Sequence, residues 1–127
     1  MNPRSNNIGV KGIIPLTENF QPDVGKILKT AWNSKIIFLC SPNNPTGNLL
    51  RKDDIIELTK SEHIIVVVDE AYIDFASEGS VIKEILNHPN LVVLRTFSKA
   101  WGLAGIRLGY CAADSEIIEY LFKIKAP

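Results

Sequence analysis

Residues 91–110, LVVLRTFSKAWGLAGIRLGY, form the stretch around which the rest of the chain is organised. An apolar run leads into a Thr-x-Ser-Lys corner, and a glycine-rich segment then leads to Arg107. A short continuous apolar run is typical of a strand buried in a sheet. Glycine lets the backbone that follows pass close to a ligand. Lys99, at the corner, is therefore the first candidate for chemistry.

Short apolar runs alternate with segments of helical periodicity along the rest of the chain. Strands are expected at 10–16, 35–40, 64–68, 91–94 and 107–113, the first at an edge because Pro15 cannot donate to a ladder. Helices are expected at 22–32, 52–62, 80–87 and 115–125, the last with Ser115 as its N-cap. This alternation predicts an α/β fold with a mostly parallel sheet and helices on both faces.

The composition indicates one soluble domain. The chain has 127 residues, and its 14 Lys+Arg balance 14 Asp+Glu, so the charge points neither to nucleic acid nor to an anionic membrane. Its longest apolar runs, such as 36–40, fall far short of the roughly 20 residues that span a bilayer. Cys40 and Cys111 lie inside apolar stretches and are expected to be buried thiols. A cytoplasmic location fits these features.

Polar side chains follow three of the predicted strands. In open α/β sheets, ligands bind outside the carboxyl ends of the strands, so these side chains are expected to meet at one edge. They are Asn44 after the strand at 35–40, Asp69 and Tyr72 after 64–68, and Thr96, Ser98 and Lys99 after 91–94.

This set suits pyridoxal 5'-phosphate, with Lys99 forming a Schiff base to it. A carboxylate such as Asp69 raises the pKa of the cofactor's ring nitrogen and so keeps it protonated. Asn44 and Tyr72 can donate to the phenolic oxygen. Each residue alone is a weak signal, because Asp69 could simply cap a turn and Asn-Pro-Thr-Gly is an ordinary turn sequence. Their combination carries the prediction.

The phosphate of such a cofactor needs hydroxyls and a guanidinium, which Thr96, Ser98 and Arg107 supply. Other kinds of site are less well supported. His63 and His88 have no partner at metal-ligand spacing, so no metal is expected. Ser98 lacks the G-x-S-x-G elbow of a hydrolase nucleophile, and no dinucleotide or P-loop fingerprint is present.

Three motifs occur together, SPNNPTG at 41–47, VVVDEAYIDF at 66–75 and LRTFSKAWGLAGIRLGY at 94–110. From about residue 10 onward the chain resembles the class I/II aminotransferases of PLP fold type I, most closely their histidinol-phosphate aminotransferase branch. The resemblance implies catalytic roles for Lys99, Asp69 and Tyr72, an antiparallel last strand in the sheet, and a cis bond at Asn44-Pro45. It gives the phenolic oxygen to Asn44 and Tyr72, and the phosphate to Thr96, Ser98 and Arg107.

The same resemblance implies that residues 1–127 are the central portion of the family's PLP-binding large domain, without the small domain and both terminal regions. The family's substrate-reading residues cannot be placed in this sequence. We therefore expect a fragment that is inactive and folds poorly by itself, because unpaired strands and uncovered apolar faces favour aggregation. The full-length protein is expected to be a homodimer.

The implied reaction is amino transfer from a small-molecule donor to a 2-oxo acid such as 2-oxoglutarate. The favoured donor is histidinol phosphate, in histidine biosynthesis. Two alternatives remain open at this point: a PLP decarboxylase of the threonine-phosphate type, and a non-catalytic truncated remnant. Carbon dioxide release without dependence on a 2-oxo acid would favour the first alternative.

Overall fold

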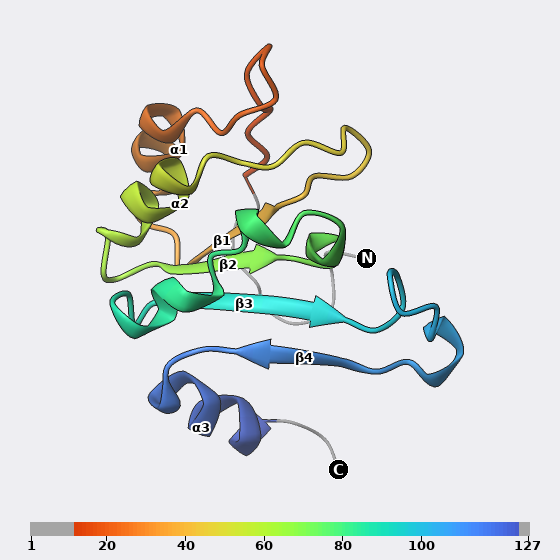
Figure 1. Ribbon diagram of the computed structural model, residues 1–127. Coiled ribbons are helices and arrows are strands. Elements are labelled where there is room, and N and C mark those ends of the chain that lie inside the picture. Colours follow the sequence, from red (N-terminus) through yellow and green to blue (C-terminus); the bar gives the residue numbers. More distant parts are fainter. Residues whose placement is uncertain (1–11, 125–127) are drawn as a thin grey trace.

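The computed structural model describes residues 12–124 and places four strands in one sheet, in the order β1-β2-β3-β4 (Figure 1). The strands are β1 (Ile36–Cys40), β2 (Ile65–Asp69), β3 (Leu91–Thr96) and β4 (Gly109–Ala112). The first three run parallel, and β4 is antiparallel to β3. The predicted α/β class, with its antiparallel last strand, is confirmed.

Three α-helices accompany the sheet: α1 (Val24–Ala31), α2 (Lys52–Thr59) and α3 (Ser115–Ile124). Short 3₁₀ helices follow β2 and β3, namely η1 (Ile73–Phe75), η2 (Ser77–Gly79), η3 (Ile82–Leu86) and η4 (Ala104–Ile106). The predicted N-cap of α3 is wrong by one residue. Asp114 caps the helix, because its Oδ1 accepts the amide N–H of Glu116 at 2.9 Å.

Two predicted helices differ from the structure. The helix expected at 52–62 ends at Thr59, where the side-chain amide of Asn90 donates to the carbonyls of Thr59 and Ser61 at 2.9 and 3.3 Å and so satisfies the helix end. The helix expected at 80–87 is the 3₁₀ helix η3. Its first amides bind side chains rather than a helical turn, since Val81 donates to the Glu70 carboxylate at 2.7 Å.

Two predicted strands also differ. Residues 12–16 form no strand, and residues 10 and 11 of that expected edge strand lie outside the described part of the chain. The strand expected at 107–113 is shortened to β4, because Arg107 has a φ of 53° in the left-handed region, which a strand cannot continue through.

The core lies on one face of the sheet, under α1, α2 and η3. Alternate residues of the strands point to this face, which we call the covered face. The buried cluster combines them with helix residues such as Ile27, Ile55 and Leu58. The strand members of the cluster are Ile37, Leu39, Val66, Val68, Leu91 and Val93.

The opposite face is open at β1. Phe38 is 71% exposed and Ile36 is 47% exposed, although Val67 and Val92, on the same face of the neighbouring strands, are buried. A continuous apolar run such as 35–40 is typical of a strand buried on both faces, but β1 is buried on one face only. Cys40 lies on the open face and is exposed, so the expectation of a buried thiol at that position is wrong.

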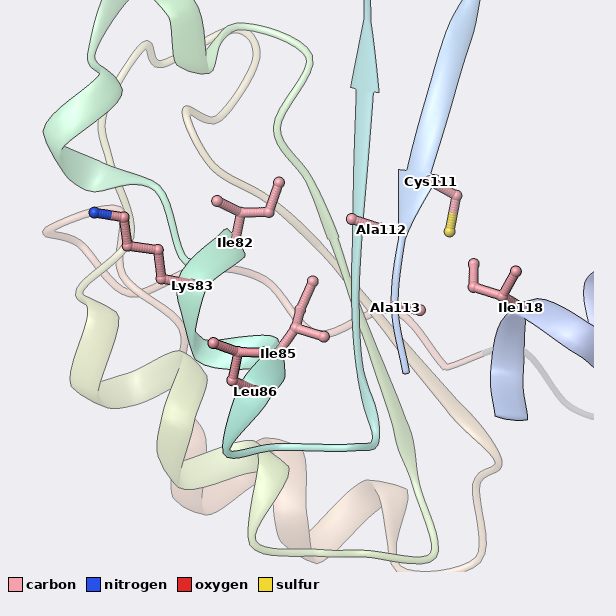
Figure 2. Close-up of a pocket in the computed structure, with 8 residues that line it drawn as sticks. All are labelled: Ile82, Lys83, Ile85, Leu86, Cys111, Ala112, Ala113 and Ile118. Carbon is pink, nitrogen blue, oxygen red and sulfur yellow. The ribbon is translucent and has the colours of Figure 1, made fainter. Parts of the chain in front are cut away.

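Beside β4, η3 and α3 lie on opposite sides of the strand (Figure 2). Between them is a hollow of about 480 Å³, mostly apolar, that contains none of the predicted site residues. Its lining residues are Ile82, Lys83, Ile85, Leu86, Cys111, Ala112, Ala113 and Ile118. Among the helices of residues 12–124, none has the length and apolar character to cross a membrane.

Candidate functional site

The predicted site residues lie at or after the carboxyl ends of β1, β2 and β3, which share one edge of the sheet (Figure 1). Cys40 at the end of β1 pairs with Asp69, and Asp69 pairs with Leu94 of β3. Parallel strands bring their carboxyl ends together, so three separate loops leave the sheet at this edge.

The loop after β1 presents Asn44 to solvent. The backbone closes through a hydrogen bond from the Asn43 N–H to the Asn48 carbonyl at 2.8 Å, and Gly47 takes a φ of 73° that favours glycine. The loop contains two cis peptide bonds, Ser41-Pro42 and Asn44-Pro45, so the cis bond expected at Asn44 is confirmed.

Tyr72 joins the first and third loops. With Asn44 it lines a hollow of about 320 Å³, whose other walls are Pro42, Asn43, Pro45, Gly47, Phe75 and Ala76. Its ring also lies beneath the Lys99 amine, with Nζ 5.1 Å from the ring centroid. At this distance the ammonium group is attracted to the aromatic face. Asn44, Tyr72 and Lys99, which are far apart in the sequence, thus meet around one ring.

Asp69 ends β2 and is half-buried. Its Oδ1 accepts the Ala71 N–H at 2.9 Å, which fixes the turn that leads to Tyr72. Within residues 12–124, its other oxygen accepts no hydrogen bond. One face of the carboxylate therefore holds the turn while the other can receive a proton donor.

Thr96 and Ser98 form a compact corner. The Thr96 Oγ1 accepts the Ser98 N–H at 3.1 Å and donates to the Leu108 carbonyl at 3.3 Å. Arg107 is exposed, and its Nη1 donates to the Ala104 carbonyl at 3.3 Å. No hydrogen bond in the described part of the chain joins Arg107 to Thr96 or Ser98. The structure thus brings the two hydroxyl residues together, whereas a shared role with the guanidinium stays a prediction.

A contact that the sequence did not indicate ties the Lys99 loop to the Tyr72 turn. The indole Nε1 of Trp101 donates to Asp74 Oδ2 at 3.1 Å, and Phe97 packs edge-on against Trp101 at 6.2 Å between ring centroids. The spacing of Asp74 and Trp101 in the sequence does not predict this hydrogen bond, because the bond depends on how β2 and β3 are aligned. It holds the backbone on both sides of the Lys99–Tyr72 contact.

The pKa of the Cys40 thiol depends on the charge of Asp69. Cys40 is exposed as a residue, but neighbouring atoms partly desolvate its thiol, and this raises its pKa. The negative charge of Asp69 raises the pKa further, because a carboxylate opposes formation of a thiolate nearby. The pKa of Cys111 is raised by burial alone. Cys40 can therefore serve as the probe of the Asp69 charge, and Cys111 as the control.

We expect Asp69→Asn to shift the alkylation of Cys40 by iodoacetamide to lower pH. Removal of the carboxylate lowers the pKa of the thiol, and only the thiolate reacts. The rate at each residue would be followed by mass spectrometry across a pH series. Cys111 should keep its profile. If both thiols moved together, or if Cys40 did not move, Asp69 would not be the charge that acts on Cys40.

The family comparison is specific. The model for "Aminotransferase class I and II" matches residues 6–127. The histidinol-phosphate aminotransferase of Flavobacterium johnsoniae is 54% identical over 115 residues, which cover 90% of this chain and 33% of that protein. The chain thus spans about a third of the length of the curated relatives it matches.

Solved structures agree with this comparison. The histidinol-phosphate aminotransferase from Sinorhizobium meliloti, in complex with pyridoxal-5'-phosphate, superposes with a TM-score of 0.77 at 29% identity, covering 88% of this chain and 32% of that one. L-threonine-O-3-phosphate decarboxylase from Porphyromonas gingivalis gives a TM-score of 0.69 at 31% identity, covering 76% of this chain and 30% of that one. With the family model matched over nearly the whole chain, the protein belongs to the class I and II aminotransferase family.

Proposed function

We propose that this chain is the cofactor-binding core of a pyridoxal 5'-phosphate-dependent aminotransferase that moves an amino group from histidinol phosphate to a 2-oxo acid such as 2-oxoglutarate, in histidine biosynthesis. The observation that carries the proposal is the Lys99 amine, 5.1 Å above the Tyr72 ring, at the edge where β2 ends in Asp69. The identity of 54% with a histidinol-phosphate aminotransferase supports this choice of substrate.

The residues at this edge fit the cofactor chemically. Lys99 offers an amine with no ion pair to an acidic side chain within residues 12–124, and Asp69 offers a carboxylate oxygen without a donor in that part of the chain. Asn44 and Tyr72 line one hollow as donors for a phenolic oxygen. Thr96, Ser98 and Arg107 would hold the phosphate. The chain thus supplies a partner of the right kind for each polar group of the cofactor.

When bound, the cofactor supplies an electron sink beside the substrate carbon that loses its proton. The protein groups then have distinct tasks. The Lys99 amine would take the proton from that carbon and deliver it to the carbon of the cofactor, which is the proton movement that amino transfer requires. Asp69 would hold a proton at the ring nitrogen by its charge, and the Tyr72 hydroxyl would donate to the ring oxygen. The Tyr72 ring also contacts the Lys99 amine, and this contact would keep the amine near the carbon atoms between which it moves the proton.

Residues 1–127 would form the central part of the large domain of such an enzyme. In such a protein, further chain would cover the apolar side chains that β1 leaves exposed, and the matched relatives are about three times as long as this chain. We further infer a homodimer and a cytoplasmic location for the full-length protein.

The test is a half-reaction. A longer protein that contains this chain, mixed with pyridoxal 5'-phosphate, would be given histidinol phosphate, and conversion of the cofactor to its amine form would be followed by absorbance. Addition of 2-oxoglutarate should restore the starting spectrum. A protein that binds the cofactor but never converts it with histidinol phosphate, while accepting another amino compound, would overturn the choice of substrate.

A decarboxylase acting on threonine phosphate is the second candidate, and the similarity to the Porphyromonas gingivalis decarboxylase favours it. Such an enzyme releases carbon dioxide and needs no 2-oxo acid. The same mixture with threonine phosphate, assayed for carbon dioxide, separates the two reactions. Release of the gas without 2-oxoglutarate would support the lyase over the transferase.

A further inference from the structure

Directly behind the candidate site lies an ion pair that the proposed chemistry does not use. The Nε and Nη2 atoms of Arg95 both donate to Oε2 of Glu70, at 3.0 and 2.9 Å. The Glu70 side chain is 1% exposed and that of Arg95 is 19% exposed. We call this pair, with Ser80 beside it, the Glu70–Arg95 clamp.

The clamp is fully hydrogen-bonded. Ser80 Oγ donates to Glu70 Oε2 at 2.9 Å and accepts from Arg95 Nη2 at 2.7 Å. The Val81 N–H donates to Glu70 Oε1 at 2.7 Å. Arg95 Nη1 also reaches the hydroxyl of Tyr110 at 3.4 Å. One network therefore joins the end of β2, the segment before η3, β3 and β4.

Buried ion pairs of this kind are costly to desolvate and are often no more stable than apolar residues of similar size. Burial lowers the pKa of Arg95, but its hydrogen bonds to Glu70 and Tyr110 raise it and prevail, so the guanidinium stays charged. A charged pair that gives little net stability is best explained by the geometry that it imposes on its neighbours.

Those neighbours are the candidate site residues. Asp69 directly precedes Glu70, and Thr96 directly follows Arg95. Successive strand residues point to opposite faces, so Arg95 lies on the covered face while Asp69 and Thr96 lie on the other. The Glu70 N–H also donates to the Leu94 carbonyl at 2.9 Å, which continues the β2–β3 ladder to this point. The clamp thus connects the ends of β2 and β3 on the covered face, which faces away from the candidate site.

We propose that Glu70 and Arg95 are positioning residues, which fix the backbone at 69–72 and 95–99 and thereby hold Asp69, Tyr72 and Lys99 in their relative places. Their role in catalysis rests on the proposed function, but their effect on the backbone does not. The amides of Ala71 and Ser98 report this effect directly, because the first donates to Asp69 Oδ1 and the second donates to Thr96 Oγ1.

The test compares Glu70→Gln, Arg95→Met and the double variant in the cofactor-free chain by amide hydrogen exchange. Each single variant should speed exchange at Ala71 and Ser98 by about tenfold or more relative to the Val66 amide in the sheet, because a charge-assisted network is lost locally. The double variant should regain global stability, since no unpaired charge stays buried, but should keep the fast exchange at both amides.

Ile55→Val is the matched control, because it weakens the core at α2 without touching the clamp. It should change exchange at Ala71 and Ser98 no more than at Val66. The proposal is overturned if the clamp variants behave like this control, or if the double variant exchanges at both amides like the parent chain.

A second readout links the clamp to the cofactor. With pyridoxal 5'-phosphate attached to Lys99, the absorbance band of the cofactor changes with pH. The midpoint of this change should shift in the clamp variants and stay fixed in Ile55→Val. If the parent chain shows no such band, this chain does not assemble the cofactor site by itself, whereas the exchange experiment still decides the role of the clamp.

Discussion

Lys99→Met is expected to abolish covalent attachment of pyridoxal 5'-phosphate completely. The aldehyde of the cofactor needs an amine held at the site, and Lys99 Nζ lies over the Tyr72 ring at the edge where the other candidate groups gather. The chain would be mixed with the cofactor, reduced with borohydride and digested, and the labelled peptide would be located by mass spectrometry. The parent chain should carry the label on Lys99.

Lys83→Met is the control for this experiment. Lys83 is also exposed, but it lies in η3 beside the hollow at β4, away from the predicted site residues (Figure 2). Its loss should leave the label on Lys99 unchanged. Label spread evenly over exposed lysines, or retained in full by Lys99→Met, would show that the chain has no specific attachment site.

Leu58→Ala is expected to lower the free energy of unfolding by about 2–5 kcal/mol, because it leaves a cavity where α2 packs on the sheet. Leu58 is 0% exposed and belongs to the buried cluster of the covered face. A single domain is stable by only about 5–15 kcal/mol, so this one change removes a large share of the total. The midpoint of urea unfolding, followed by circular dichroism, measures the loss.

Leu86→Ala provides the comparison, since the same atoms are removed from a side chain that is 89% exposed. Its effect should stay within about 0.5 kcal/mol. Equal losses for the two leucines would mean that the covered face is not packed in solution as it is in the structure. A broad transition in the parent chain would indicate that the open side of β1 prevents cooperative folding.

The positions of β1, β2 and β3 were predictable because apolar runs and their turn boundaries depend on local sequence. β2 and β3 occur within one or two residues of the expected ranges, since they are flanked by strands on both sides and read as continuous apolar runs. β1 reads the same way, yet Phe38 is exposed. The apolar run alone does not show that one face of β1 is left uncovered in the described residues; the expectation of uncovered apolar faces comes from the resemblance to longer family members.

The residues of the candidate site were predictable from the sequence, but the side chains that hold their backbone in place were not. Asp69 ends one strand, and Tyr72 and Lys99 each lie three residues after a strand, so the rule for strand ends finds them. The Glu70–Arg95 clamp could not be found this way, because its two charges sit 25 positions apart and meet only through the β2–β3 register. The left-handed φ of Arg107 was equally hidden, since no glycine or asparagine at that position signals it.

Trp101 gives the loop of Lys99 its own optical probe. The chain has two tryptophans, and the other, Trp32, directly follows α1 and is separated from the site loops in sequence and in the fold. The indole of Trp101 is hydrogen-bonded to Asp74 and packed against Phe97, so its emission should respond when that loop opens or when a chromophore settles beside it. A Trp32→Phe chain would therefore show movement at the site through intrinsic fluorescence, without any added dye.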